Sequence, residues 1–263
     1  MDEGAGSGWL GRTEVLLGRQ AMELIEKSRV YVFGLGAVGS YAVEALARAG
    51  VGTFRLVDFD VVKESNINRQ LYALRSTMDR PKVDVAAERV LDINQNARVE
   101  ARNVFAHADT LGELLAGEPD LVIDAVDSLN PKTEIIAAAS ALGIPVFSAL
   151  GAATRTDAGA IAFGPLLQAK GCPLGRVLRK RLRRRGIEGD LWCVYSTEPR
   201  NTDAVREPEE DADDYRRGRS RNVLGSLSTM TGLFGLRLAH ETVMRLGGVE
   251  GQAPRQSVNK ARR

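Results

Sequence analysis

The segment GLGAVG at residues 34–39 constrains the fold of this chain more than any other. It follows an apolar run typical of a buried strand and opens a segment with helical periodicity. In that setting Gly34 permits a tight turn, Gly36 lets the backbone approach a phosphate, and Gly39 lets helix and strand pack closely. The pattern predicts a nucleotide-binding strand–turn–helix. Taken alone, it is most typical of NAD-dependent dehydrogenases, and the plain alternative is a turn that binds nothing.

The segments around this loop alternate between strand and helix patterns. Apolar runs typical of strands occupy residues 30–33, 53–57, 98–103, 120–123 and 145–148, and helical patterns occupy residues 38–49, 82–93, 111–115 and 132–142. A further helical pattern covers residues 14–27. Strands that alternate with helices form parallel sheets covered on both faces. We therefore expect an α/β fold: a Rossmann-like, doubly wound, mainly parallel sheet with helices on both faces.

The pattern changes after residue 150. Residues 154–159 form a turn-like cluster between short extended runs, and a basic helix (174–185), a short strand (192–196), a polar stretch (198–221) and a last helix (224–246) follow. This predicts a C-terminal extension with short antiparallel strands and helices. We interpret residues 1–263 as one domain, with a nucleotide-binding core at 12–150 and a substrate-binding part at 151–263. Six of the eight residues from Glu207 to Asp214 are acidic, so we expect residues 198–221 to form a mobile loop.

Composition excludes several classes of protein. The chain has 36 basic and 34 acidic residues and a formal net charge of +2, which argues against a protein that coats nucleic acid with its whole surface. No stretch reaches the roughly 18 apolar residues of a membrane span, and the charged N-terminal residues do not resemble a signal peptide. Two cysteines, Cys172 and Cys193, are too few for a disulfide scaffold or a four-thiolate zinc site. We expect a reducing, cytoplasmic location.

Polar residues follow the second predicted strand, where ligands bind in open parallel sheets. Asp58 ends that strand at the spacing expected for a carboxylate that holds a ribose. Asp60 follows it, and Asn66, Arg69 and Gln70 share one face if residues 66–71 form a helical turn. Each of these residues could equally be a solvated surface group, but their joint placement at strand ends favours a binding site.

Two further residues favour a triphosphate over a dinucleotide. Lys82 begins the helix predicted at 82–93 and, with Arg69, supplies more positive charge than a pyrophosphate needs. Asp127 follows the strand predicted at 120–123, where its carboxylate could hold magnesium against phosphates.

These motifs together resemble the ubiquitin-activating-like adenylyltransferases, which include the ThiF, MoeB and HesA proteins. The resemblance covers roughly residues 12–150 and depends on GLGAVG (34–39), AGVG (49–52), DFD (58–60), NINRQ (66–70), Pro81-Lys82 and DAVD (124–127). It implies that ATP and magnesium convert a carboxylate to an acyl-adenylate, with Asp58 on the ribose, Asn66, Arg69 and Lys82 on the phosphates, and Asp127 on the metal. It also implies that Arg12 reaches across a homodimer interface to the γ-phosphate.

The resemblance extends to the tRNA threonylcarbamoyladenosine dehydratase branch of this family. RTE (12–14), NINRQ, RVLRK (176–180) with RRRG (183–186), and VYSTEP (194–199) look like that branch. The branch implies ATP-dependent ring closure on the threonylcarbamoyl side chain of a tRNA adenosine. A nucleophile in that side chain makes a protein nucleophile unnecessary. Accordingly, we interpret Cys193 as a buried thiol and His107 and His240 as surface or structural residues.

Seven of the ten residues from Arg176 to Arg185 are basic. In a helix, leucines 174, 178 and 182 form one apolar stripe, and the cations occupy the other faces. This density favours tRNA phosphate contacts, although a solvated charged face and a membrane-surface helix are alternatives. We expect tRNA contacts from six residues: Arg176, Arg179, Lys180, Arg183, Arg184 and Arg185.

Two other functions remain open from the sequence. The same pocket could activate the C-terminus of a small sulfur-carrier or ubiquitin-like protein, although many such activators have paired Cys-x-x-Cys zinc ligands and this chain has none. The chain could also be a non-catalytic nucleotide-binding module. A sulfur-transfer protein is a further partner that the sequence allows.

Overall fold

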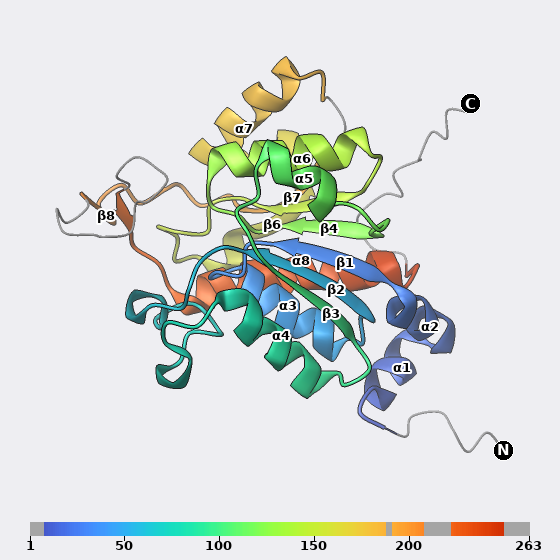
Figure 1. The fold of residues 1–263 in the computed structure, drawn as a ribbon. Coiled ribbons are helices and arrows are strands. Elements are labelled where there is room, and N and C mark those ends of the chain that lie inside the picture. Colours follow the sequence, from blue (N-terminus) through green and yellow to red (C-terminus); the bar gives the residue numbers. More distant parts are fainter. Residues whose placement is uncertain (1–7, 188–190, 208–221, 250–263) are drawn as a thin grey trace.

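The computed structural model describes residues 8–187, 191–207 and 222–249, which form a twisted sheet with helices on both faces (Figure 1). The sheet has seven strands in the order β3-β2-β1-β4-β5-β7-β6. All neighbouring strands are parallel except the antiparallel pair β6 and β7. The strands are β1 (Arg29–Phe33), β2 (Thr53–Asp58), β3 (Arg98–Asn103), β4 (Leu121–Asp124), β5 (Val146–Ala149), β6 (Ile161–Pro165) and β7 (Trp192–Ser196).

The strand order reverses between β1 and β4. The chain runs outward from β1 through β2 to β3 and then returns to the other side of β1 to form β4. Loops that leave neighbouring strands in opposite directions open a crevice at the carboxyl edge of such a sheet, and ligands bind there. The glycine loop follows β1, and the loop that contains Asp127 follows β4. The topology therefore brings both segments to the same switch point.

Two apolar cores lie on opposite faces of the sheet (Figure 1). One contains side chains of α2, α3, α4 and α8, and the other contains side chains of α5, α6 and α7. Strand β1 contributes side chains to both cores, because Val32 packs in the first and Phe33 in the second.

The helices are α1 (Gly11–Leu17), α2 (Arg19–Lys27), α3 (Gly39–Arg48), α4 (Lys82–Ile93), α5 (Ala108–Leu114), α6 (Leu129–Ala141), α7 (Pro173–Arg184) and α8 (Ser228–Leu246). Short 3-10 turns occupy η1 (Glu64–Asn66), η2 (Arg75–Thr77), η3 (Ala158–Ala160) and η4 (Leu166–Gln168).

The predicted α/β fold is confirmed, and each predicted strand of the core lies within one residue of an observed one. The helix predicted at residues 14–27 is wrong in one respect. It is two helices, because Gly18 adopts a φ of 85° between α1 and α2, which ends the first helix. The helices predicted at 111–115 and 132–142 begin three residues earlier than expected, at Ala108 and Leu129.

The C-terminal part contains the predicted short antiparallel pairing. The two-stranded sheet of β8 (Val205–Arg206) and β9 (Val223–Leu224) takes residues from both the predicted polar loop and the predicted last helix, so α8 begins only at Ser228. Residues 208–221 lie outside the described part of the chain, and the expected mobility there stays a prediction. The single-domain interpretation also stays a prediction. Over the described residues, no helix is long and apolar enough to span a membrane.

Candidate functional site

The three glycines of the 34–39 loop have different surroundings. Gly34 has a φ of 87°, and an added Cβ would lie 2.9 Å from the carbonyl oxygen of Ala125. A Cβ on Gly39 would lie 1.8 Å from the carbonyl oxygen of Gly34, so both positions need glycine for the fold itself. A Cβ on Gly36 would meet only the Gln70 side chain, at 3.6 Å. The fold therefore does not require glycine at Gly36, whereas a ligand that approaches the backbone there would.

The start of α3 continues this surface. Val38 occupies the cap position and its side chain makes no capping hydrogen bond, whereas the Ser40 N–H of the first turn donates to the Gly36 carbonyl at 3.1 Å. A helix start without a side-chain cap keeps its other N–H groups and its partial positive charge available to an anion. The loop and helix thus fit a phosphate-binding role.

Asp58 joins the glycine loop to the end of β2. Its Oδ2 accepts a hydrogen bond from the Leu35 N–H at 2.6 Å, and its Oδ1 accepts one from the Asp60 N–H at 3.0 Å. Burial raises the pKa of Asp58 above its usual range, although Lys82 acts in the opposite direction. Each carboxylate oxygen has a second lone pair, so Asp58 can still accept a hydrogen bond from a ribose hydroxyl.

Lys82 and Asp60 form an ion pair beside Asp58. The Lys82 Nζ lies 2.8 Å from the Asp60 Oδ2, and the lysine side chain is 6% exposed whereas the aspartate side chain is 47% exposed. The backbone supports the pair, since the Lys82 N–H donates to the Asp60 carbonyl at 3.0 Å. An ammonium has three donors, so one bond to Asp60 leaves capacity for phosphate oxygens.

The helical turn predicted at residues 66–71 is present over residues 66–70. The N–H groups of Arg69 and Gln70 both donate to the Asn66 carbonyl, at 3.0 and 2.9 Å. The side chains are partly used within the loop: Asn66 Oδ1 accepts from the Lys63 N–H at 3.2 Å, and Arg69 donates to the Ser65 carbonyl and Asn68 Oδ1, both at 2.8 Å. The turn therefore fixes these groups in place before any ligand binds.

Asp127 acts on Arg69 from the loop after β4, across the switch point. Burial lowers the pKa of Arg69, and the negative charge of Asp127 acts in the opposite direction. Over the described residues there is no group of three or more His, Cys, Asp or Glu side chains that could hold a metal. A magnesium ion would then depend on one carboxylate, phosphate oxygens and water, a donor set that suits it.

Arg12 is the one predicted site residue of the core that the structure does not bring to the others. It lies exposed on α1, and Leu10, two residues earlier, packs against Gly50, which leads into the amino end of β2. Figure 1 shows α1 at the end of the sheet away from the loops that follow β1 and β2. Arg12 therefore cannot contact the glycine loop of its own chain.

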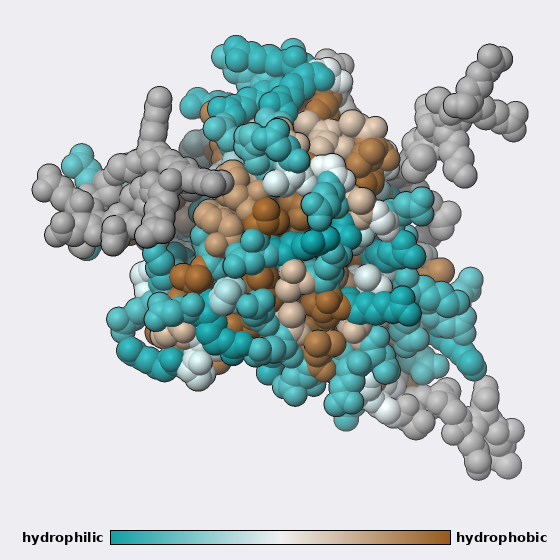
Figure 2. Space-filling model, in the orientation of Figure 1, coloured by the Kyte–Doolittle hydropathy of each residue, from teal (hydrophilic) through white to brown (hydrophobic). Residues whose placement is uncertain are grey.

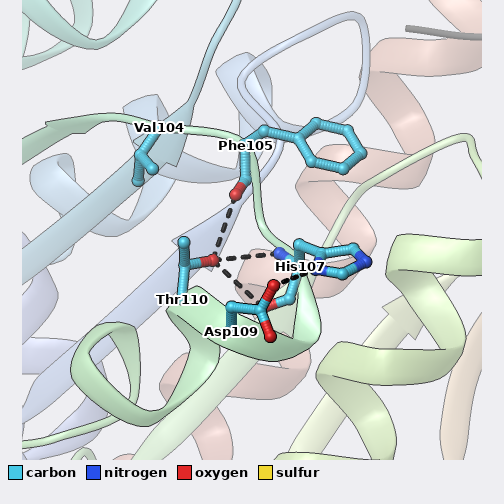
Figure 3. A pocket seen from close by; sticks show the side chains of 5 residues that line it. All are labelled: Val104, Phe105, His107, Asp109 and Thr110. Carbon is cyan, nitrogen blue, oxygen red and sulfur yellow. Dashed lines mark hydrogen bonds and ion pairs between the residues drawn. The ribbon is translucent and has the colours of Figure 1, made fainter.

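A cavity of about 390 Å³ follows β3, and no sequence pattern predicted it. Its lining residues are Val104, Phe105, His107, Asp109 and Thr110 (Figure 3). It begins one residue beyond Asn103, which pairs with Asp58 in the sheet. Phe105 contacts Phe59 edge to face, with ring centroids 5.0 Å apart. The segment is irregular in sequence, so no periodic pattern could have indicated it.

The basic helix α7 lies on the outer side of α6, and Figure 2 shows a hydrophilic surface above it. Its cations divide into two groups. Arg179 donates to the carbonyls of Leu166 and Ala169 at 2.8 Å, Arg181 bonds to Asn130, and Arg185 pairs with Glu134. The second group is exposed and has no ion pair or side-chain hydrogen bond to any described residue: Arg176, Lys180, Arg183 and Arg184. Of the six predicted tRNA-contact residues, Arg179 and Arg185 therefore already bond to the rest of the protein, and the tRNA contacts of all six stay a prediction.

Comparisons with known proteins agree with this geometry. Residues 11–262 match the model of the ThiF family. The chain is 38% identical over 187 residues to a tRNA threonylcarbamoyladenosine dehydratase of Bacillus subtilis, covering 71% of this chain and 74% of that protein. It is 34% identical over 236 residues to the Escherichia coli protein of the same name, covering 86% and 88%. The crystal structure of the Escherichia coli dehydratase in complex with ATP superposes with a TM-score of 0.81 over 91% of this chain and 93% of that one, at 31% identity.

Proposed function

The chain belongs to the ThiF family, and on this premise we propose that it is an enzyme that uses ATP to dehydrate threonylcarbamoyladenosine in tRNA. The observation that carries the proposal is the extent of the likeness. It spans the nucleotide edge of the sheet and also the C-terminal part with β7 and α7, over 86% of the chain. A likeness limited to the core would support only nucleotide binding, because one fold hosts many functions.

We assign the ATP site to the crevice at the switch point. The backbone at Gly36 and the start of α3 receive phosphate oxygens, and Asp58 receives a ribose hydroxyl. The cavity after β3, the strand that pairs with β2, receives the base, with Phe105 as an apolar wall. The remaining phosphate contacts come from Asn66, Arg69, Gln70 and Lys82.

Asp127 is the residue that would hold magnesium, which supplies positive charge next to the phosphates. Asp60 is proposed to position Lys82 and not to contact the nucleotide. Its ion pair holds the Lys82 ammonium at the edge of the site until phosphate oxygens arrive.

The residues of the site suit an adenylation reaction. A carboxylate oxygen of the substrate attacks the α-phosphorus and pyrophosphate leaves; a nucleophile of the same side chain then displaces AMP and closes the ring. Arg69 and Lys82 stabilise the charge that moves to the pyrophosphate. No protein nucleophile is needed: Cys172 and Cys193 are both buried, and burial raises the pKa of the Cys193 thiol.

The tRNA substrate would contact the exposed cations of α7. Arg176, Lys180, Arg183 and Arg184 present four charges to solvent with no partner among the described residues. Phosphate contacts of this kind give affinity without reading sequence. A tRNA-modifying enzyme is expected in the cytoplasm.

A second copy of the chain would complete the site. Helix α1 exposes Val15 and Leu16, with exposed fractions of 77% and 81%, and Trp9 next to it is 52% exposed. Neighbouring apolar side chains on one short helix favour a protein contact. In a homodimer, Arg12 on that helix would reach the γ-phosphate bound to the partner subunit.

The test is mass analysis of tRNA nucleosides after incubation of threonylcarbamoyladenosine-containing tRNA with the protein and ATP. We expect a nucleoside lighter by one water, together with ATP–pyrophosphate exchange that depends on added tRNA. Exchange that depends only on a carrier protein would instead identify an activator of a carrier C-terminus, with a sulfur-transfer partner. NAD binding without ATP binding would identify a non-catalytic module.

A further inference from the structure

Three polar side chains form a closed cluster beneath the switch point. The Lys132 Nζ lies 2.6 Å from the Asp124 Oδ2 and 3.2 Å from the Ser148 Oγ, and the Ser148 hydroxyl donates to the same Asp124 oxygen at 2.7 Å. All three residues are 0% exposed. None of them was part of the predicted site, and none faces a ligand in the proposed function.

The cluster joins both ends of the segment that carries Asp127. Asp124 is the last residue of β4, and Lys132 lies in the first turns of α6, where its N–H donates to the Ser128 carbonyl at 3.1 Å. Asp127 lies between these two residues. The ion pair therefore closes residues 124–132 into a loop around the position proposed for the metal ligand.

The second oxygen of Asp124 acts on the loop itself. Asp124 Oδ1 accepts a hydrogen bond from the Val126 N–H at 3.2 Å. The preceding residue, Ala125, donates to the Phe33 carbonyl at 2.8 Å and packs its own carbonyl against Gly34. The cluster thus holds the turn at residues 125–128 against the glycine loop, on which the nucleotide would lie.

Core packing alone does not account for this cluster. Apolar side chains of similar volume often replace a buried ion pair with no loss of stability. Such side chains could not accept the Val126 N–H or connect β4 to α6 across the turn. The geometry accounts for the cluster as a device that fixes the turn.

We propose that Lys132 is a positioning residue of the adenylation step: through Asp124 it holds the turn that places Asp127. This inference rests on the proposed function. It concerns a residue that never touches ATP or the substrate, so its effect should differ from the effect of a ligand contact. Loss of the tie should slow the chemical step and leave the glycine loop, Asp58 and Lys82 in place to bind ATP.

The experiment compares Lys132→Met with the control Thr133→Val. Thr133 lies one residue further on α6, is equally buried, and donates to the Leu129 carbonyl without contacting Asp124. In tRNA-dependent pyrophosphate exchange, we expect Lys132→Met to lower kcat about tenfold or more while the KM for ATP changes less than about threefold. Thr133→Val should keep kcat within about twofold of the original protein.

Hydrogen exchange of the ligand-free protein provides a readout that does not depend on activity. We expect Lys132→Met to accelerate exchange at the amides of residues 125–128 about tenfold, with β4 and the rest of α6 unchanged. An unchanged kcat, or faster exchange spread evenly over α6 and β4, would overturn the inference. If the original protein shows no tRNA-dependent exchange, the proposed function fails, and the hydrogen-exchange comparison still decides whether Lys132 holds the turn.

A double variant keeps the test decisive if Lys132→Met does not fold. Asp124→Asn with Lys132→Met removes both charges, and the asparagine Oδ1 can still accept the Val126 N–H. We expect this variant to fold and to retain the kcat defect, because the connection from β4 to α6 is gone. Full activity of the folded double variant would overturn the inference.

Discussion

At the scale of single residues, the glycine loop separates what the fold needs from what a ligand needs. Gly34 and Gly39 face backbone atoms at distances that no Cβ tolerates. Gly36 has room on every side except toward Gln70, yet it lies at the turn where phosphates are proposed to bind. Asp58 combines the two needs, because it ties β2 to the loop and keeps lone pairs for a ribose.

Gly36→Ala is expected to leave the fold intact and to weaken ATP binding. The added methyl group contacts only the flexible end of Gln70, so Tm should change by less than about 3 °C. The same methyl group would keep phosphate oxygens from the backbone, and we expect the Kd for ATP to rise about tenfold or more. Calorimetric titration and thermal unfolding measure both quantities. Gly39→Ala is the contrasting variant and should not yield folded protein; equal ATP affinity in Gly36→Ala would contradict the assignment.

Asp58→Asn is expected to separate stability from binding. Burial raises the pKa of Asp58 in the native state. At pH values between the usual pKa and this raised pKa, the native state binds more protons than the unfolded state, so the free energy of unfolding falls as pH rises through this window. Above the window, the ionised carboxylate lowers the stability of the native state by its full cost. Asparagine lacks this pH-dependent cost but can accept only one of the two backbone N–H groups. We therefore expect the free energy of unfolding of the variant, relative to the original protein, to rise with pH across the window. Denaturant unfolding over a pH series measures this. ATP affinity should fall, and a variant less stable at neutral pH than at acid pH relative to the original would refute the argument.

At the scale of elements, α7 has an inner and an outer set of cations. Arg179, Arg181 and Arg185 bond to η4 and α6, which orients the helix. The other cations project away from these contacts. An amphipathic basic pattern in a sequence does not distinguish the two sets, because an arginine can bury its stem along the protein and still carry its charge.

Replacing the four exposed cations of α7 by glutamine is expected to weaken tRNA binding without affecting ATP. The variant contains Arg176→Gln, Lys180→Gln, Arg183→Gln and Arg184→Gln. If each charge contacts one phosphate, the slope of log affinity against log salt should fall by about four and the affinity by roughly a thousandfold at moderate salt. Filter binding over a salt series measures both. Arg185→Gln, which loses only the Glu134 pair, is the control; an equal effect of this single change would argue against the outer set as the tRNA contact.

At the scale of the whole molecule, Arg12 lies far from the other proposed site residues of the same chain. The crevice lies at the carboxyl edge of the sheet, whereas α1 with Arg12 lies at the other end (Figure 1). The exposed apolar side chains of the same helix are available to a second copy. A homodimer related by a two-fold axis would bury both helices and exchange both arginines.

Mixing two inactive variants tests this exchange. We expect Arg12→Ala and Arg69→Ala each to lose adenylation, and Arg69→Ala to keep its fold. If Arg12 acts in the partner's site, a heterodimer of the two variants contains one complete site, so an equal mixture that has exchanged subunits should recover about a quarter of the original activity. Pyrophosphate exchange measures the recovery, and each variant mixed with itself is the control. No recovery, despite subunit exchange seen by native mass spectrometry, would rule out the shared site.

The local pattern of the sequence was sufficient for much of this structure. The order and bounds of the core strands, the glycine loop and the turn at residues 66–70 depend on periodicity and turn chemistry within short windows, which a single sequence displays. The same holds for the basic helix. The sequence therefore determined which elements form and which chemical groups stand at the ends of strands.

Only the tertiary structure decided which of these groups meet. Lys82 pairs with Asp60, Lys132 with Asp124, and Arg185 with Glu134, over separations of 22, 8 and 51 residues. The remoteness of Arg12 and the cavity after β3 likewise depend on how distant segments come together. Such features arise from contacts between elements that are distant in the chain, and the free energy of those contacts depends on burial and register in the assembled sheet, which no local window of sequence contains.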